Sequence, residues 1–141
     1  GGDALTCECL IRLPWPPKEL SPNSRKDRRG ATGKRAAYRE AGFYAAKEAR
    51  AVIPEDATLA IKFFPPDDRR RDLDNMLASI KVGLDGIAKA AGVDDYGWSF
   101  TLARHKPIKG GAVLVHVIPA EPDNWRQIGD IAKGMIRGQV G

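Results

Sequence analysis

The sequence predicts a single small α/β domain built on a mixed sheet of about four strands. The chain has 141 residues, which is the size of one domain. Hydrophobic residues make up 43% of it and charged residues 29%, as in an ordinary globular protein with an apolar core. Strand-like and helix-like apolar patterns follow one another in the order β-α-β-α-β-β-α, which is typical of an α/β fold.

The first half of the chain contains two predicted strands with a helix between them. Residues 5–13 alternate between apolar and polar side chains, as in a half-buried strand, and the prolines that follow at once end it. A polar and basic loop then leads to an alanine-rich helix over residues 34–52, which ends before Pro54. Residues 58–64 alternate again and form the second predicted strand.

An amphipathic helix is predicted over residues 73–91. Its apolar side chains recur at i, i+3, i+4 and i+7, which places them on one face. Asp72 is a suitable N-cap and Gly92 a suitable C-cap for this helix.

Two further strands and a helix complete the predicted domain. Residues 96–102 and 113–117 alternate as the third and fourth strands, and the final helix includes Trp125. We expect the second and third strands to be parallel, because a helix connects them, and the last two strands to form an antiparallel hairpin. Residues 1–4 are expected to be a tag or a disordered start, and residues 119–141 a C-terminal linker and helix.

The charge balance favours a polyanionic partner. Lys and Arg number 23 and Asp and Glu 18, a net charge of +5. The cations gather in one run from Arg25 to Arg39 and a second at residues 69–71. Either run alone is also explained as a solvated charged face. Two basic runs that flank a cluster of carboxylates favour nucleic acid as the binding partner.

Several other classes of protein are disfavoured. The sequence has no apolar run of membrane-spanning length and no secretory leader, so we expect a protein of the cytoplasm that does not bind membranes. Cys7 and Cys9 lack the further Cys or His residues that a four-ligand zinc site needs. Neither a Ser-His-Asp set nor a glycine-rich phosphate loop is present. The remaining candidates for chemistry are carboxylates.

Asp72 and Asp74 stand where the second strand gives way to the helix, directly after three arginines. A structural interpretation makes Asp72 the N-cap and lets Asp74 interact with the helix dipole. In a functional interpretation, both carboxylates turn toward one point beyond the helix end. Oxygen ligands gathered there suit Mg²⁺ or Mn²⁺, which also bind substrate phosphates. Asp94 and Asp95 offer further ligands just after the same helix.

Lys81 shares the polar stripe of this helix with Asp74. A cation there could bind phosphate or stabilise negative charge in a transition state. An exposed lysine that pairs with Asp85 at i+4 explains the same spacing equally well.

These motifs together resemble the RusA-like Holliday junction resolvases, a family of small endonucleases common in phages and prophages. The resemblance covers about residues 5–118 and leaves out the C-terminal helix. It rests on residues 13–17 (LPWPP), 65–75 (PPDDRRRDLDN), Lys81, 84–86 (LDG), 91–95 (AGVDD) and 109–111 (KGG). The interval from Asn75 to Lys81 is longer, by nearly one helical turn, than in the best-known member.

The resemblance implies a Mg²⁺-dependent homodimer that binds four-way DNA junctions and makes paired symmetric nicks in recombination and repair, with Mn²⁺ able to replace Mg²⁺. Asp72, Asp74 and Asp95 match the family's catalytic aspartates and Lys81 its essential lysine, and Asp94 would be an additional metal ligand. A bacterial or phage-infected cell would be its setting. The residues expected to contact DNA are Arg25, Lys26, Arg28, Arg29, Lys34, Arg35, Arg69, Arg70, Arg71 and Lys109.

A straight helix over residues 72–91 would hold Asp95 roughly 30 Å from Asp72 in the same subunit. Either the helix breaks near Gly83 or Gly86, or two antiparallel helices of a two-fold dimer bring Asp95 of one chain to Asp72 of the other.

Three other functions compete with a resolvase. The first is a protein of the same fold that binds branched DNA without cutting it. The second is a metal enzyme that uses the Asp72-x-Asp74 pair on sugar nucleotides or phosphate esters. The third is a basic structural protein in which Asp72 only caps a helix.

Overall fold

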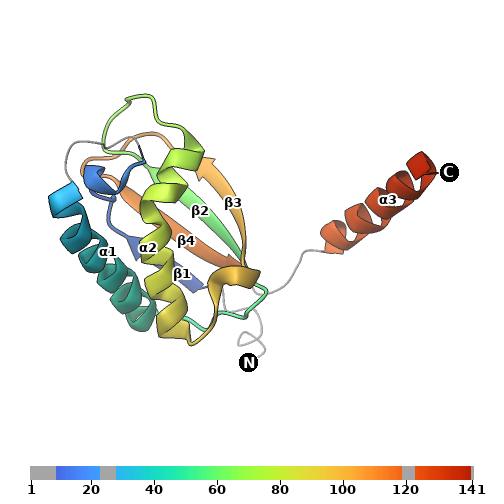
Figure 1. Ribbon diagram of the computed structural model, residues 1–141, viewed down its shortest axis with the longest axis horizontal. Coiled ribbons are helices and arrows are strands. Elements are labelled where there is room, and N and C mark those ends of the chain that lie inside the picture. Colours follow the sequence, from blue (N-terminus) through green and yellow to red (C-terminus); the bar gives the residue numbers. More distant parts are fainter. Residues whose placement is uncertain (1–8, 23–27, 119–122, 141) are drawn as a thin grey trace.

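The computed structural model describes residues 9–22, 28–118 and 123–140 and confirms the small α/β domain with a mixed four-stranded sheet. The predicted order β-α-β-α-β-β-α is confirmed, with two short 3-10 turns added (Figure 1). The elements are β1 (Cys9–Leu13), η2 (Lys18–Leu20), α1 (Arg28–Glu48), β2 (Thr58–Phe64), α2 (Leu73–Ala91), η3 (Asp95–Gly97), β3 (Ser99–Arg104), β4 (Ala112–Ile118) and α3 (Asp123–Val140).

The sheet has the order β1-β4-β2-β3, and β2 and β3 are parallel as predicted. The predicted hairpin of the last two strands is wrong, because β4 pairs antiparallel with both β1 and β2 and does not touch β3. Burial explains the difference. Val113, Val115 and Val117 are completely or almost completely buried, so β4 takes a central position, whereas the more polar β3 forms an edge.

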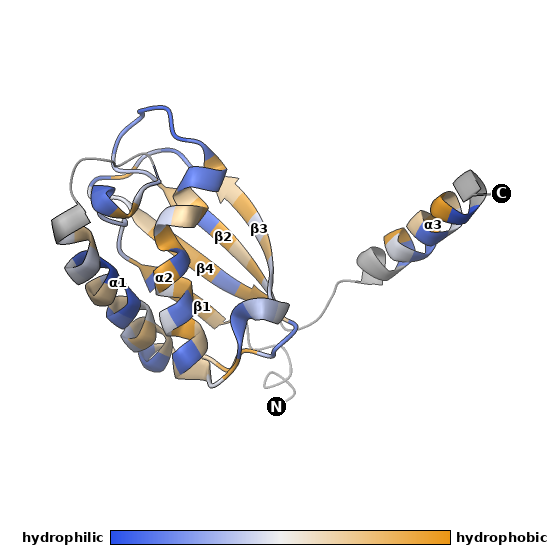
Figure 2. Ribbon diagram, viewed as in Figure 1, coloured by the Kyte–Doolittle hydropathy of each residue, from blue (hydrophilic) through white to orange (hydrophobic). Residues whose placement is uncertain are grey.

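Helices α1 and α2 cover one face of the sheet (Figure 1). Their apolar residues join those of the strands in one core, and Figure 2 shows the strands coloured largely as hydrophobic. The two helices pack very closely at glycines. A Cβ on Gly42 would lie 2.1 Å from the Gly83 carbonyl oxygen, and one on Gly86 would lie 1.9 Å from that of Arg39.

Some boundaries differ from the predicted ones. Residues 5–8 of the first predicted strand lie outside the described part of the chain. Helix α1 begins at Arg28 instead of residue 34 and ends at Glu48. Strand β3 begins at Ser99, because the preceding residues form η3 and Trp98 turns inward, where its indole N–H donates to the Pro54 carbonyl at 3.0 Å.

Helix α2 runs without interruption from Leu73 to Ala91, so the alternative of a break near Gly83 or Gly86 is wrong. Both glycines serve the contact with α1. Asp72 occupies the N-cap position, and Gly92 ends the helix in the left-handed conformation with φ 73°, as predicted. The helix is about 27 Å long.

Candidate functional site: a basic pocket at the start of α2

Three segments that are far apart in the sequence meet where β2 ends and α2 begins. They are residues 13–17, the Pro65-Pro66 pair and the glycines of the β3–β4 turn. Gly111 packs so closely that a Cβ there would lie 3.0 Å from Cβ of Trp15 and 3.1 Å from Pro66. The buried hydroxyl of Tyr38 donates to the Pro14 carbonyl at 2.7 Å and ties α1 to the first segment. Three of the motifs that carry the family resemblance, residues 13–17, 65–75 and 109–111, therefore meet at one end of the domain.

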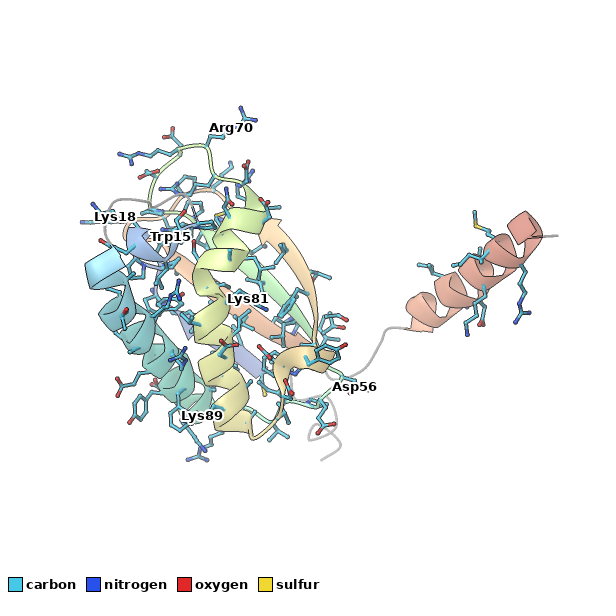
Figure 3. The ribbon with its side chains drawn as sticks, viewed as in Figure 1. Trp15, Lys18, Asp56, Arg70, Lys81 and Lys89 are labelled. Carbon is cyan, nitrogen blue, oxygen red and sulfur yellow. The ribbon has the colours of Figure 1, made fainter. Side chains whose placement is uncertain are left out.

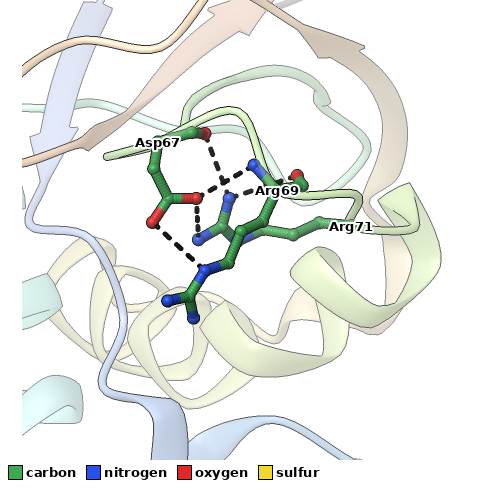
Figure 4. Close-up of polar contacts among 3 residues, drawn as sticks. All are labelled: Asp67, Arg69 and Arg71. Carbon is green, nitrogen blue, oxygen red and sulfur yellow. Dashed lines mark hydrogen bonds and ion pairs between the residues drawn. The ribbon is translucent and has the colours of Figure 1, made fainter.

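Asp67 organises the loop that carries the three arginines (Figure 4). Its carboxylate accepts from the Arg69 backbone N–H at 3.0 Å and forms an ion pair of 2.9 Å with Arg71. Arg71 also donates to the Asp67 carbonyl at 3.2 Å. These contacts, first the Arg69 N–H and then the Arg71 guanidinium, lower the pKa of Asp67 below its ordinary value.

Arg71 is positioned from two further directions. Its guanidinium lies 5.4 Å from the centroid of the Trp15 ring, a cation–π contact. The guanidinium of Arg104, at the end of β3, donates to the Arg71 carbonyl. Arg71 is therefore a fixed part of the loop, whereas Arg70 is exposed at the tip of the loop (Figure 3).

An open pocket of about 570 Å³ lies between this loop, the first turns of α2 and the start of η2. Lys18 and Trp15 lie at the same end of the fold as Arg70 (Figure 3). Four cations and one carboxylate line the pocket, so its charge favours an anion. The lining residues are Trp15, Pro16, Pro17, Lys18, Ser21, Arg69, Arg70, Arg71, Asp72, Asn75, Met76 and Ser79.

Asp72 lines this pocket, and its side chain makes no capping hydrogen bond. Its carbonyl, not its carboxylate, accepts the first helical N–H, that of Met76, at 3.0 Å. The N-cap interpretation is thus confirmed for the position of Asp72 and not for its side chain. Asp74 is exposed in the first turn of α2 and is not among the lining residues. Both carboxylates lie at the helix end whose dipole favours negative charge.

Asp94 and Asp95 lie beyond the opposite end of α2. The Asp94 carboxylate accepts from the Tyr96 N–H at 3.0 Å and caps η3. Asp95 instead lies close to the carboxyl of Asp85. Burial first, and then this contact with Asp95, raise the pKa of Asp85 above its ordinary value, although the charges of Lys81 and Arg39 oppose the rise.

Lys81 lies midway along α2, away from the basic pocket (Figure 3). Its ammonium group is 5.0 Å from the centroid of the Phe100 ring, and its charge acts on Asp85. Within a single chain, the surroundings of Lys81 therefore match the interpretation as an exposed lysine beside Asp85. The lysine that lines the pocket together with Asp72 is Lys18.

The first basic run is described in part. Arg25 and Lys26 lie outside the described residues, and only the backbone is described for Arg28 and Arg29. In the rest of the run, Lys34 forms an ion pair of 3.0 Å with Glu19, and Arg35 is exposed on α1. Lys109 is exposed in the β3–β4 turn.

Sequence reasoning missed several residues of this region. Asp67 belongs to the motif at residues 65–75, but its ion pair with Arg71 depends on the fold of the loop, because a spacing of four predicts a pair only on a helix. Asn75 belongs to the motif at residues 65–75, which gave it no role, and Lys18 and Ser79 carried no signal that separates them from other polar residues. Arg104 reaches the arginine loop from a different strand and could be placed only by the fold.

Among residues 9–22, 28–118 and 123–140, no group of three or more His, Cys, Asp or Glu side chains is placed to hold a metal ion. The four aspartates of the predicted site are thus divided between the two ends of α2 in one chain. The helices of this described part also include none that is long and apolar enough to cross a membrane.

The chain was compared with known proteins by sequence and by structure. No family model matches the chain. An uncharacterized protein of Xylella fastidiosa (strain Temecula1) is 41% identical over 93 residues, which cover 60% of this chain and 59% of that protein. The match therefore spans about three fifths of the relative. The periplasmic domain of Helicobacter pylori MotB aligns over 89% of this chain and 90% of its own at 14% identity, with a TM-score of 0.37, too low to indicate a shared fold.

Proposed function

We propose that this protein is a Mg²⁺-dependent endodeoxyribonuclease that resolves four-way DNA junctions by paired symmetric nicks, as its resemblance to RusA-like resolvases implies. One observation carries the proposal. Three motifs of that resemblance, residues 13–17, 65–75 and the glycine turn at 109–111, come together around a basic pocket lined by Asp72.

The charge of the pocket supports a phosphodiester substrate. Arginine guanidinium groups bind phosphate oxygens with two parallel hydrogen bonds, and Arg69, Arg70 and Arg71 line the pocket together. Asp67 and Trp15 hold Arg71 in place before a ligand arrives, which reduces the entropy lost on binding. Arg70 is exposed and is free to reach a DNA backbone.

The donor set suits Mg²⁺. This ion is usually held by one or two carboxylates, several waters and substrate phosphates, and Asp72 and Asp74 can supply the carboxylates. When bound, the ion would activate a water and neutralise charge on the phosphate. The arginine loop would hold the flanking phosphates. Lys18 would stabilise the negative charge that develops in the transition state near Asp72. From the sequence, this role was expected of Lys81.

A two-fold dimer would complete the site with Asp95. The solvent-facing residues of α2 are Asp74, Ala78, Lys81, Asp85 and Lys89, and all of them are exposed. If two such helices pair antiparallel about an axis near Lys81, Asp74 faces the partner's Lys89, and the two Lys81 side chains meet near the axis, each one turn from Asp85 of its own chain. The partner's Asp95, which lies beside its Asp85, then comes toward the end of α2 that carries Asp72 and Asp74.

The proposal is tested by cleavage of a labelled four-way junction beside a linear duplex, in Mg²⁺, Mn²⁺ or EDTA. We expect wild type to make paired nicks only with metal, and Asp74→Asn to bind the junction without cutting it. Asp56→Asn is the matched control, because Asp56 is an exposed aspartate far from the pocket (Figure 3). Absence of metal-dependent nicks in wild type would overturn the proposal.

Mixing Asp74→Asn with Asp95→Asn subunits tests the shared site. A heterodimer with shared sites contains one site with both aspartates intact, so random exchange restores about a quarter of the wild-type nicking, as single nicks instead of paired ones. Sites contained in single chains would give no recovery, provided that subunit exchange is demonstrated by mass spectrometry.

A second candidate is a protein that binds branched DNA without cutting it. The division of the four aspartates between the two ends of α2 in one chain favours this alternative. Normal junction binding with no product in either metal would establish it.

A further inference from the structure

Helix α3, which lies outside the family resemblance, presents an uncovered apolar stripe. Ile128, Ile131, Met135 and Ile136 are 48–65% exposed, and their spacing of three, seven and eight residues places them on one side of the helix. Figure 2 shows hydrophobic and hydrophilic residues on different sides of α3, and Figure 1 shows the helix apart from the sheet. No described residue of α3 belongs to the hydrophobic core.

The composition of α3 indicates that it needs a packing partner. An isolated helix of 18 residues is marginal in water even when it is rich in alanine. Gly129 and Gly134 have no atom near the place of a Cβ, so no close contact requires them, and they weaken the helix further. Burial of the apolar stripe is the remaining source of stability.

The sheet has a complementary surface on the face opposite α1 and α2. Side chains of a strand alternate between faces, so Ala60 and Leu114 lie opposite the buried residues beside them in β2 and β4. With Leu10 and Ala103 they line a shallow hollow of about 610 Å³ that extends over all four strands. Leu10 is 57% exposed. Lys62, Thr101 and His116 also line the hollow, so its open face is mixed, with Leu10, Ala60, Ala103 and Leu114 as its apolar part. A solvated face of an antiparallel sheet is ordinarily polar, and this apolar part is the exception.

The length of α3 and the reach of its connection to β4 allow the helix to lie over this hollow. The helix is about 27 Å long, and the seven residues of β4 span about 23 Å. The five peptide steps from Ile118 to Asp123 reach at most about 17 Å. A helix is about 10–12 Å across, so this connection allows α3 to turn back over the sheet. A connection this short also gives the helix of the same chain a millimolar effective concentration, which favours it over a second copy.

We propose that α3 docks through its apolar stripe onto the open face of the sheet in the same chain, as a third layer over Leu10, Ala60, Ala103 and Leu114. This docking is independent of the proposed nuclease activity. It covers the face opposite α2, so the basic pocket and the exposed stripe of α2 stay accessible.

Paramagnetic relaxation in the full chain tests the docking. A spin label is attached at Lys133→Cys, on the polar side of α3, in a chain that also carries Cys7→Ala and Cys9→Ala. We expect it to broaden the methyl signals of Leu10 and Leu114 more strongly than those of Leu84 and Ile87 on α2. Equal or absent broadening would overturn the proposal.

A mixed sample identifies the chain that supplies the helix. Half of the chains carry the spin label without isotope, and the other half carry the methyl isotope without a label. The methyl signals stay sharp if α3 covers its own sheet. Broadening in the mixture would overturn the proposal in favour of α3 exchange between two copies.

Hydrogen exchange in two variants provides a second readout. Ile131→Ser with Met135→Ser removes apolar stripe residues, and Asp130→Ser is the control on the polar side. We expect amide exchange of α3 to be faster by about ten-fold or more in the double variant and unchanged in the control. Equal exchange rates in all three proteins would overturn the docking.

Discussion

Aspartates lie at both ends of α2, but the charges that surround them differ between the two ends. At the start of the helix, Asp72 lines a pocket with four cations, and neighbouring Asp67 is fully engaged by Arg69 and Arg71. Toward the end of the helix, the carboxyls of Asp85 and Asp95 contact each other. The pKa of Asp67 is lowered and that of Asp85 is raised.

This difference shows which end still needs a partner. At the first end, the arginines and the helix dipole already compensate the carboxylates and leave positive charge over for an anion. At the second end, two carboxyls share a site near the negative end of the dipole. A proton, a metal ion or a cation from a second subunit would relieve that repulsion.

The largest expected effect is on the rate of junction cleavage, and it differs between variants of the neighbouring residues Asp94 and Asp95. If the proposed site is shared, Asp72→Asn and Asp95→Asn each reduce the single-turnover rate of junction cleavage by about 100-fold or more. Asp94→Asn changes the rate little, because an asparagine oxygen still accepts from the Tyr96 N–H. A large loss in Asp94→Asn with none in Asp95→Asn would contradict this assignment.

A stability measurement probes the helix that joins the two ends. Gly86→Ala would place a Cβ 1.9 Å from the Arg39 carbonyl oxygen, so α1 and α2 must separate. We expect the free energy of unfolding in urea to fall by about 1–3 kcal/mol. Gly134→Ala on α3, where the space is open, is the control and should not lower the free energy of unfolding, because alanine favours a helix more than glycine does. An unchanged midpoint for Gly86→Ala would show that the glycine contact is dispensable.

DNA affinity distinguishes the basic end from the rest of the surface. Arg70→Gln should weaken junction binding and reduce the slope of log affinity against log salt by about one. Lys47→Gln makes the same charge change in the last turn of α1, distant from the pocket, and should have little effect. Equal losses in the two variants would indicate binding by overall charge alone.

The smallest expected effect is the pH dependence of stability. Asp67 has a folded pKa below its ordinary 3.8, so its stabilising contribution is complete above pH 3.8 and disappears as the pH falls through the folded value. Asp85 has a folded pKa above 3.8, so it destabilises the fold above that raised value, and the penalty disappears as the pH falls toward 3.8.

At pH 7, Asp67→Asn should therefore lower stability and Asp85→Asn should raise it. The second change is less than about 1 kcal/mol because Asp85 is exposed. Both differences from wild type should vanish in acid, as urea unfolding at a series of pH values can show. Changes of the same sign in the two variants would contradict the comparison.

Local patterns in the sequence predicted most of the elements. The alternation of β2, the apolar face of α2 and the caps at Asp72 and Gly92 depend on residues within a few positions of one another, so they are visible in the sequence. The arginine loop was located for the same reason, since residues 69–72 are consecutive. The junction-resolving activity remains a proposal that rests on the resemblance and on the pocket.

Only the tertiary structure decided the order of the strands and the grouping of the aspartates. β4 lies between β1 and β2, because its burial on one face outweighs the short connection to β3. Asp85 and Asp95 meet because Gly92 turns the chain back after α2, a contact that neither residue's local pattern reveals. Periodicity reports which face of an element is buried, whereas pairing between distant elements depends on how all the buried faces fit together.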